Sequence, residues 1–346
     1  MSQELQLRDI GEQGLLARLQ AFCPAEMMGD DAALLSVSAG RSLVVSADML
    51  VDGVHFSVGM ANPALHTTTP ADVGWRSAAA NLSDLAAMGA DPLGITVCLG
   101  LPDVTPVAWV EQLYQGLSDC LRPFHTPIVG GDICRSTVLT VAITAFGQVS
   151  PDCAIHRSQA RPGDAILVTG GHGAARAGLE LLLDPERGLS LADGDRQALI
   201  AAHQRPRPRL DAIAHLRQLS PGPSRIAGMD SSDGLADAVL QICRASGVGA
   251  RLERRAIPLP TAVQGWLSPE QALEWALYGG EDFELVLCLP VELAEQAIAR
   301  IGDRSAIVGT ITADTAVVLQ DSSGGHADES LSLDRGFQHF AADRAD

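Results

Sequence analysis

The feature that most constrains this fold is the segment from Val73 to Pro92, which reads VGWRSAAANLSDLAAMGADP. At the helical period its apolar side chains share one face, while Ser77, Asn81 and Asp84 fall on the opposite face. Most of the remaining residues are alanine, so neighbouring backbone can approach on all sides. A carboxylate held there needs a partner. Because the chain has no lysine, that partner is an arginine, a hydrogen-bond donor or a metal ion, and we favour the metal.

The length of 346 residues predicts two domains. Composition changes at Ser150-Pro151, and beyond it predicted strands and helices alternate. We therefore expect an α/β (α+β) fold with domains at residues 1–150 and 151–346, the second built on a mixed sheet.

The net charge of −18 argues against a nucleic-acid partner, because a phosphate backbone would be repelled. No apolar stretch is long enough to span a bilayer, and the charged N-terminal segment has no signal-peptide core. The seven cysteines are scattered and form no CxxC pair, which indicates free thiols in a reducing compartment. We expect a cytoplasmic protein with no membrane partner.

Acidic residues recur next to apolar segments. They are Asp30-Asp31, Asp48, Asp84, Asp132, Asp230 with Asp233, and Glu281 with Asp282. We expect short Gly- or Ser-containing turns there, after a strand over 43–46 and another over 127–129. Taken singly, each acid is explained by the preference of Asp for turns and helix caps. Together they favour Mg²⁺, which binds carboxylates, waters and substrate phosphates.

Nucleotide-binding motifs are mostly excluded. Thr169-Gly170-Gly171-His172-Gly173 has Arg176 where a dinucleotide fingerprint needs its third glycine, so we expect a tight turn with a weak anion-binding option at the helix N-terminus. Without lysine, neither a P-loop nor a protein-kinase fold is possible. Phosphates would then be bound by Mg²⁺, backbone N–H groups and an arginine. The candidate arginine is Arg157.

Two further residues are left open by the sequence alone. His55 follows Asp52-Gly53 near Asp48, and is either structural or a ligand-binding group. Glu281 stands in a Gly-Gly turn directly before a predicted strand. That turn is either a plain loop or a place where backbone approaches a ligand.

In this order the motifs resemble thiamine-monophosphate kinase, in the superfamily of aminoimidazole ribonucleotide synthetase and selenophosphate synthetase. The resemblance runs from GDDAALL to Asp334-Arg335-Gly336-Phe337. Its most specific parts are VGWRSAAANLSDLAAMGADP, IVGGD, ARPGD with ILVTG, DSSDGL and GGEDFEL.

The resemblance implies a role for each matching residue. The Mg²⁺ ligands would be Asp31, Ser46, Asp48, Asp84, Asp132, Asp230 and Asp233; the ATP contacts Gly131, Asp132, Arg157 and Ser232; and the thiamine-phosphate contacts His55, Glu281 and Phe337. In one departure, Ala47 stands where the family usually has threonine, so a hydroxyl ligand is missing there.

The implied reaction is transfer of a phosphoryl group from ATP to thiamine phosphate, the last step of thiamine diphosphate biosynthesis. An ionised phosphate acceptor needs no general base, so we expect direct in-line transfer aided by several Mg²⁺ ions and no catalytic side chain. The resemblance also implies a homodimer formed through the N-terminal sheet, with the site in the cleft between domains. The alternatives are another ATP-dependent enzyme of the superfamily and a noncatalytic Mg²⁺-nucleotide-binding protein.

Overall fold

The computed structural model describes residues 5–24, 32–60, 62–222, 225–302 and 304–336. Two compact units divide the chain. The first unit takes Met1–Ala154, Leu182–Pro185 and Gln204–Leu210, and the second takes Ile155–Leu181, Glu186–His203 and Asp211–Asp346. No helix in the described ranges is long and apolar enough to cross a membrane.

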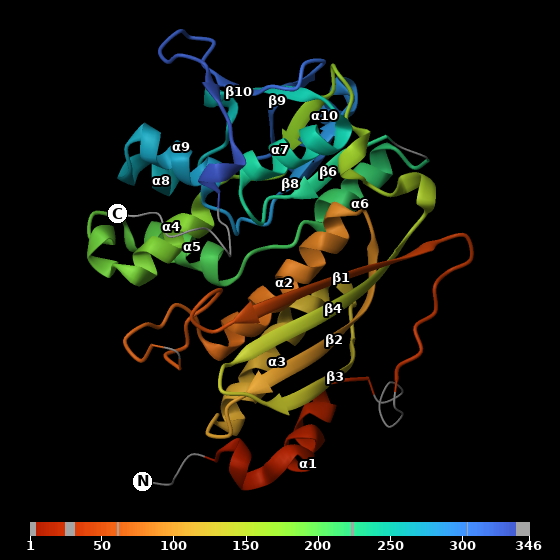
Figure 1. Ribbon diagram of the computed structural model, residues 1–346, viewed down its shortest axis with the longest axis vertical. Helices are drawn as coiled ribbons and strands as arrows, with labels where there is room; N and C mark the ends of the chain where they lie inside the picture. Colours follow the sequence, from red (N-terminus) through yellow and green to blue (C-terminus); the bar gives the residue numbers. More distant parts are fainter. Residues whose placement is uncertain (1–4, 25–31, 61, 223–224, 303, 337–346) are drawn as a thin grey trace. The chain divides into compact units, whose positions relative to one another are not determined.

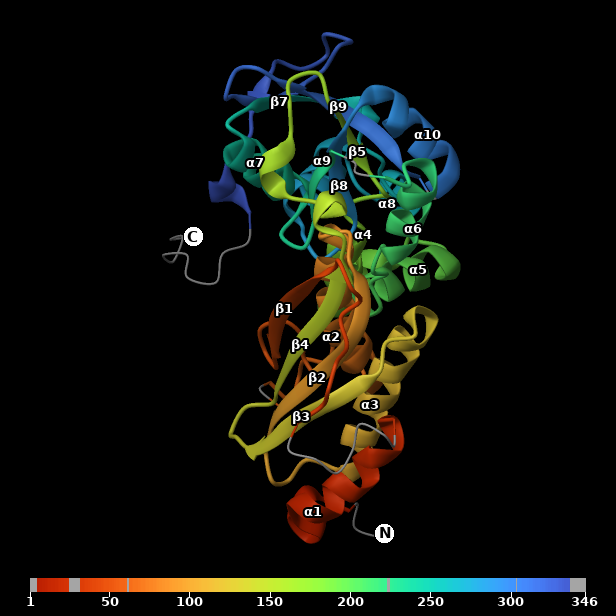
Figure 2. The same cartoon turned by 90° about the vertical axis from the view of Figure 1, so that its right-hand side faces the viewer.

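The first unit is a four-stranded sheet covered on one face by helices. Its elements are α1 (Leu7–Leu19), η1 (Gln20–Phe22), β1 (Ser42–Val51), α2 (Pro70–Ala87), β2 (Asp91–Leu101), α3 (Val107–Leu121), η3 (Arg122–Phe124), β3 (Ile128–Arg135), β4 (Thr140–Val149) and η4 (Pro151–Cys153). The strand order is β1-β4-β2-β3, and only the β2–β3 pair is parallel. Helices α2 and α3 lie along one face of this sheet, as Figure 2 shows.

Helix α2 is the predicted alanine-rich segment. Thr69 and Asp72 form a capping box at its start, and Pro70 occupies its first turn, where proline is tolerated. Its polar stripe is buried: the hydroxyl of Ser77 donates to the carbonyl of Val73 at 2.8 Å, and Asn81 donates to the carbonyl of Ser77 at 2.9 Å. These two donors therefore bond to carbonyls of their own helix, whereas the third member of the stripe, Asp84, is only partly buried.

Close helix packing explains the small residues of this segment. A Cβ on Gly74 would lie 2.0 Å from the carbonyl oxygen of Leu113, and one on Gly116 would lie 1.9 Å from that of Ala71. Helices α2 and α3 can cross at this separation only because both positions are glycine.

The second unit is a seven-stranded mixed sheet with helices around it. Its elements are η5 (Arg157–Gln159), β5 (Ala165–Val168), α4 (Ala174–Leu183), η6 (Pro185–Gly188), α5 (Asp193–Gln204), α6 (Leu210–Leu219), β6 (Ala227–Asp230), α7 (Leu235–Ser246), β7 (Gly249–Glu253), η7 (Arg254–Ala256), α8 (Thr261–Trp266), α9 (Pro269–Tyr278), β8 (Leu285–Leu289), α10 (Val291–Ile301), β9 (Ala306–Thr312), β10 (Val317–Gln320), β11 (Glu329–Ser330) and η8 (Leu333–Arg335). The strand order is β11-β10-β7-β9-β5-β8-β6. Figures 1 and 2 together label the strands from β5 to β10. Residues of α7 and α9 pack with β5, β6, β7 and β8 into one core.

The expected fold class is confirmed, and so are most of the expected elements. The turns expected at Asp48, Asp84 and Asp132 are wrong: Asp48 lies inside the ten-residue strand β1, Asp84 inside helix α2, and Asp132 inside β3. In both strands apolar residues resume after the acid, at Met49 and at Ile133, and ladder hydrogen bonds outweigh the turn preference of a single aspartate. Helix α8 and the two-residue strand β11 were not expected from the sequence.

Candidate functional site

Two of the predicted site residues, Asp31 and Phe337, lie outside the described residues. The others divide between the units. The first unit carries Ser46, Asp48, His55, Asp84, Gly131 and Asp132, and the second carries Arg157, Asp230, Ser232, Asp233 and Glu281.

Oxygen donors gather in the first unit where β1 meets α2. The hydroxyl of Ser46 donates a short hydrogen bond to Oδ2 of Asp84. Because side chains alternate along a strand, Asp48 projects to the same face of β1 as Ser46, whereas Ala47 projects to the opposite face. The partner of the Asp84 carboxylate thus includes a hydroxyl donor, one of the three kinds left open by the sequence.

Asp132 lies on the other face of the sheet. The strand register places it in one row with Cys98, Ala142 and Met49. Met49 is 58% exposed, so this row belongs to the face that α2 and α3 leave uncovered. Within the first unit, the structure therefore does not bring Asp132 to the side occupied by Asp48.

Gly131 sits beside Asp132 under tight packing. A Cβ at this position would lie 1.9 Å from the carbonyl oxygen of Val97 on β2. Any side chain would therefore force β3 away from β2. Strand packing alone is thus enough to require glycine at this position, whether or not it also contacts a nucleotide.

His55 has a defined hydrogen-bond role. The backbone N–H of Val51 donates to Nδ1 of His55 at 3.1 Å, and Nη2 of Arg76 donates to the His55 carbonyl at 3.4 Å. Since Nδ1 accepts this bond, a neutral His55 carries its proton on Nε2. The ring therefore has an Nε2–H donor, which suits contact with an anionic oxygen.

In the second unit two loops are joined by hydrogen bonds. The backbone N–H of Ser231 donates to the carbonyl of Glu284 at 2.8 Å, and that of Glu281 donates to the carbonyl of Ser232 at 2.7 Å. Asp230, the last residue of β6, is buried and accepts from the hydroxyl of Ser232 at 3.0 Å. These contacts fix the DSSDGL loop against the GGEDFEL loop.

The GGEDFEL loop has an unusual backbone. Glu281 and Phe283 adopt φ values of 61° and 52°, in the left-handed region that disfavours residues other than glycine. His203 of α5 is buried, and its Nδ1 lies 3.4 Å from Oε2 of Glu281. The Glu281 carboxylate therefore has a fixed neighbour, although nothing in the sequence pattern connects these two residues.

Asp282 closes the N-terminus of α4. Its two carboxylate oxygens accept from the backbone N–H groups of Gly173 at 2.7 Å and Ala175 at 2.9 Å. Burial raises the pKa of Asp282 to about 7, although these two donors favour the charged form. The anion-binding option at this helix is therefore wrong for an external ligand, because the chain's own carboxylate occupies it.

Glu284 and Thr169 hold the other end of this loop. The Thr169 hydroxyl donates to Oε2 of Glu284 at 2.5 Å and accepts from the N–H of Leu285 at 2.9 Å. A Cβ on Gly170 would lie 2.2 Å from the Glu284 carboxylate, so the glycine makes room for it. This internal contact explains the first glycine of the TGGHG segment.

Arg157 lies on the surface of η5. Its carbonyl accepts from the Ser246 hydroxyl at 2.8 Å. Burial raises the pKa of Asp237, the charge of Asp233 adds to this shift, and the Arg157 guanidinium opposes it. The Arg157 guanidinium therefore acts electrostatically on Asp237 in the first turn of α7.

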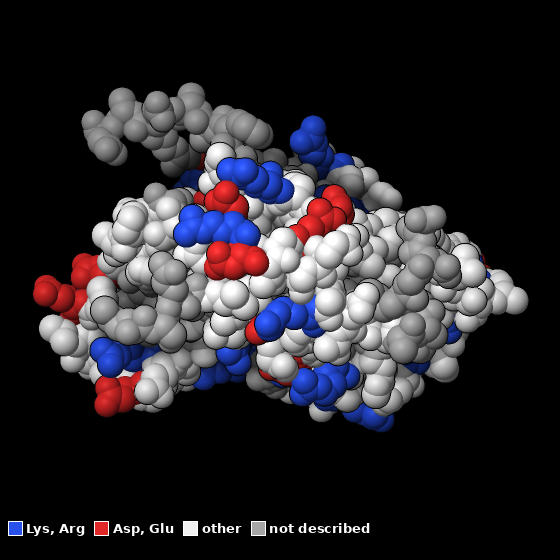
Figure 3. Space-filling model, turned by 90° about the horizontal axis from the view of Figure 1, so that it is seen from below, with Lys and Arg blue, Asp and Glu red and all other residues white. Residues whose placement is uncertain are grey.

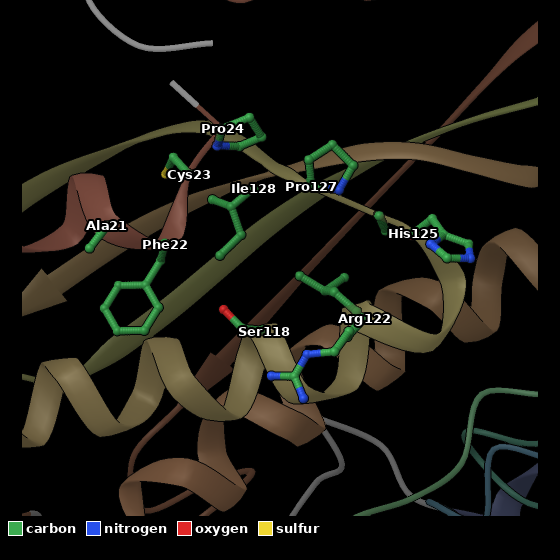
Figure 4. A pocket seen from close by; sticks show the side chains of 11 residues that line it. Ala21, Phe22, Cys23, Pro24, Ser118, Arg122, His125, Pro127 and Ile128 are labelled. Atoms are coloured by element: carbon green, nitrogen blue, oxygen red, sulfur yellow. The ribbon is translucent and has the colours of Figure 1, made fainter. Parts of the chain in front are cut away.

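No three His, Cys, Asp or Glu side chains within the described ranges are arranged to hold a metal ion by themselves. A hollow of about 460 Å³ in the first unit, lined by Phe22, Cys23, Arg122 and His125 among others, contains none of the predicted site residues (Figure 4). On the face that Figure 3 shows, arginines stand singly or beside carboxylates and form no continuous basic surface among the described residues.

Family comparisons cover most of the sequence. The family model of the AIR synthase related protein, N-terminal domain, matches residues 29–149, and that of the C-terminal domain matches residues 161–322. Both regions contain the acidic residues described above.

Known proteins are similar to the chain over nearly its whole length. A thiamine-monophosphate kinase of Synechococcus elongatus is 52% identical over 336 residues, 96% of this chain and 98% of the relative. The crystal structure of a thiamine-monophosphate kinase from Stenotrophomonas maltophilia has a TM-score of 0.76 at 31% identity, covering 89% of this chain and 95% of that one. AaThiL complexed with AMPPCP and TMP has a TM-score of 0.70 at 27% identity, covering 95% and 99%.

Proposed function

This chain belongs to the thiamine-monophosphate kinases of the AIR synthase related family, and on that premise we propose that it transfers a phosphoryl group from ATP directly to the phosphate of thiamine phosphate. The products are ADP and thiamine diphosphate. The observation that carries the mechanism is the gathering of oxygen donors where β1 meets α2, in a chain that has no lysine to neutralise phosphate.

The donor set fits Mg²⁺. Ser46, Asp48 and Asp84 offer only oxygen atoms, which hard cations prefer, and neither thiolate nor imidazole lies among them. Three such donors are too few for a closed cage, but Mg²⁺ keeps several waters and binds substrate phosphates. When bound, the ion would neutralise phosphate charge that the chain's carboxylates would otherwise repel.

The second unit supplies further proposed contacts. Asp230 and Asp233 are proposed Mg²⁺ ligands, Ser232 and Arg157 are proposed ATP contacts, and Glu281 is a proposed contact of thiamine phosphate. Their support is the pair of joined loops that presents Asp230–Asp233 and Glu281 together. The expected meeting of this group with that of the first unit, like the roles of Asp31, Gly131, Asp132 and Phe337, stays a prediction.

The chain's residues orient charge and need not move protons. The second pKa of a phosphate monoester is about 6, so the acceptor is largely ionised at neutral pH and no general base is required. His55, with its donor at Nε2, suits a phosphate oxygen as a hydrogen-bond donor. Catalysis of this kind rests on alignment and charge stabilisation rather than on a covalent intermediate.

An assay with three acceptors tests this function. With ATP and Mg²⁺, thiamine phosphate should yield ADP and thiamine diphosphate in equal amounts, and excess EDTA should abolish both. Product formation only with an aminoimidazole precursor or with selenide would assign the chain to another activity of the superfamily. Binding of Mg²⁺-ATP without ADP production from any acceptor would refute an enzymatic role.

We also propose a homodimer formed through the first unit's uncovered sheet face. Leu43, Val45 and Met49 of β1 are 49%, 55% and 58% exposed there, and exposed apolar rows of this kind mark interfaces. Sedimentation should give twice the 36.2 kDa of one chain, and Val45→Glu should halve that mass. Val291→Glu, which changes an exposed valine on α10, is the matched control. A monomeric parent protein would contradict the proposal, and the cytoplasmic location stays a prediction.

A further inference from the structure

Arg335 binds three partners near the end of the described chain. Its Nη2 pairs with Glu274 of α9 and its Nη1 pairs with Glu329 of β11. Its guanidinium carbon also lies 4.4 Å from the centre of the Tyr278 ring. One side chain therefore ties the segment after β11 to the last turn of α9.

This arrangement is stronger than a surface ion pair. The side chains of Arg335, Glu274 and Glu329 are 42%, 41% and 39% exposed, and a single pair at such exposure contributes little. Tyr278, in contrast, is only 8% exposed, so the guanidinium lies over a ring fixed in the core. Two carboxylates and one ring together define a single orientation of the planar group.

The segment that Arg335 holds lies against the DSSDGL loop. Leu331 is buried in the core, and the Ser332 side chain caps η8. The turn η8 packs against α7, and a Cβ on Gly336 would lie 4.0 Å from the carbonyl oxygen of Asp233. Figure 2 shows this dark-blue turn beside α7.

The same arginine also reaches the GGEDFEL loop. Tyr278 is the last residue of α9, and Gly279-Gly280-Glu281 follow directly. A Cβ on Gly234 would lie 3.3 Å from Cα of Tyr278, so the two loops touch at this residue as well. Three segments meet here: the loop before α7, the start of the loop before β8, and the chain after β11.

We propose that Arg335 is a positioning residue for the acceptor site, which it fixes by holding Leu333–Gly336 and Tyr278 together beside Asp233 and Glu281. This inference rests on the proposed function, because it takes the acceptor to be thiamine phosphate. Arg335 acts through the segments that it joins and does not itself contact the substrate. Without the contacts of Arg335, the segment Leu333–Gly336 can move while the sheet of the second unit stays folded.

The test compares the steady-state kinetics of variants of two arginines, Arg335 and Arg254, which both pair with Glu329. Arg335→Met keeps an apolar side chain for Tyr278 and removes both ion pairs and the cation. Arg254→Met is the matched control, because Arg254 pairs with the same Glu329, at 3.3 Å, but belongs to η7 after β7. Arg335→Lys, which keeps a cation for the Tyr278 ring, is the conservative variant.

Arg335→Met should raise KM for thiamine phosphate about tenfold and leave KM for ATP within twofold, whereas Arg254→Met should change neither. Arg335→Lys should recover part of the loss. An equal rise in both KM values, or a fall in kcat alone, would show that Arg335 stabilises the unit generally rather than the acceptor site, and would overturn the inference. An unchanged KM for thiamine phosphate in Arg335→Met would also overturn it. If the parent protein forms no thiamine diphosphate, the proposed function itself fails, which is a separate result.

Discussion

The two groups of candidate residues are held in place by different means. Ser46, Asp48 and Asp84 project from a ten-residue strand and an eighteen-residue helix, whose backbone hydrogen bonds fix them. Glu281 stands instead on a loop with two left-handed residues, and side chains such as Asp282 hold it. Regular elements tolerate changes around a functional side chain, whereas a loop depends on its supporting residues. In the first group, activity should therefore depend most on the ligand side chains themselves. In the second group, it should depend most on the residues that support the loop.

The largest effect is expected at the first group. Asp48→Asn keeps the shape of the side chain but removes a charge proposed to hold Mg²⁺, so kcat should fall by about 10²–10³-fold or more. The melting temperature should stay close to that of the parent, because the strand is unchanged. Asp119→Asn, which removes a half-buried carboxylate on α3 that pairs with Arg122, is the control, and near-normal turnover by Asp48→Asn would contradict the metal assignment.

A smaller effect tests whether the strands of the first unit are packed as rigidly as we infer from their regular structure. Gly131→Ala places a Cβ 1.9 Å from the Val97 carbonyl oxygen and should lower the free energy of unfolding by about 1–3 kcal/mol or more. In Gly130→Ala the nearest atom would be 3.8 Å away, so the change should stay within about 1 kcal/mol. Urea unfolding measures both, and equal effects would show that β3 shifts freely against β2.

The last prediction concerns the loop support Asp282 and is a change of stability with pH. Its pKa rises from 3.8 to about 7 on folding, so between those values the native state binds more protons than the unfolded state. The free energy of unfolding of the parent should therefore fall as the pH rises from about 4 to about 7, with a slope of at most about 1.4 kcal/mol per pH unit from this group.

Asp282→Asn lacks this titration, so its stability relative to the parent should increase over the same range and level off above about pH 7. Urea unfolding at pH 5 and pH 8 measures the difference. Asp193→Asn on α5 controls for the loss of one negative charge. A difference that does not change with pH would show that Asp282 ionises in the native loop without cost.

Most elements could be predicted from the sequence because they rest on local signals. Helix α4 is predicted from the sequence over 174–183 and is observed over Ala174–Leu183, and α2 is marked by the Thr69-Pro70-Ala71-Asp72 start. Periodicity could not show that Ser77 and Asn81 are buried, because polar side chains that donate to their own helix have the same spacing as those that face a ligand. The role of the TGGHG turn was missed for a similar reason, since its anion comes from Asp282, more than a hundred residues away.

The sequence by itself determined the family, the fold class and the reaction, because these depend on motifs whose order along the chain is their signal. Only the tertiary structure decided that Asp48 and Asp132 face opposite sides of one sheet, and that His203 and Arg335 support the loop of Glu281 and its neighbours. Strand register and contacts between distant segments fix these relations. They result from packing across the whole unit, and no local pattern records them.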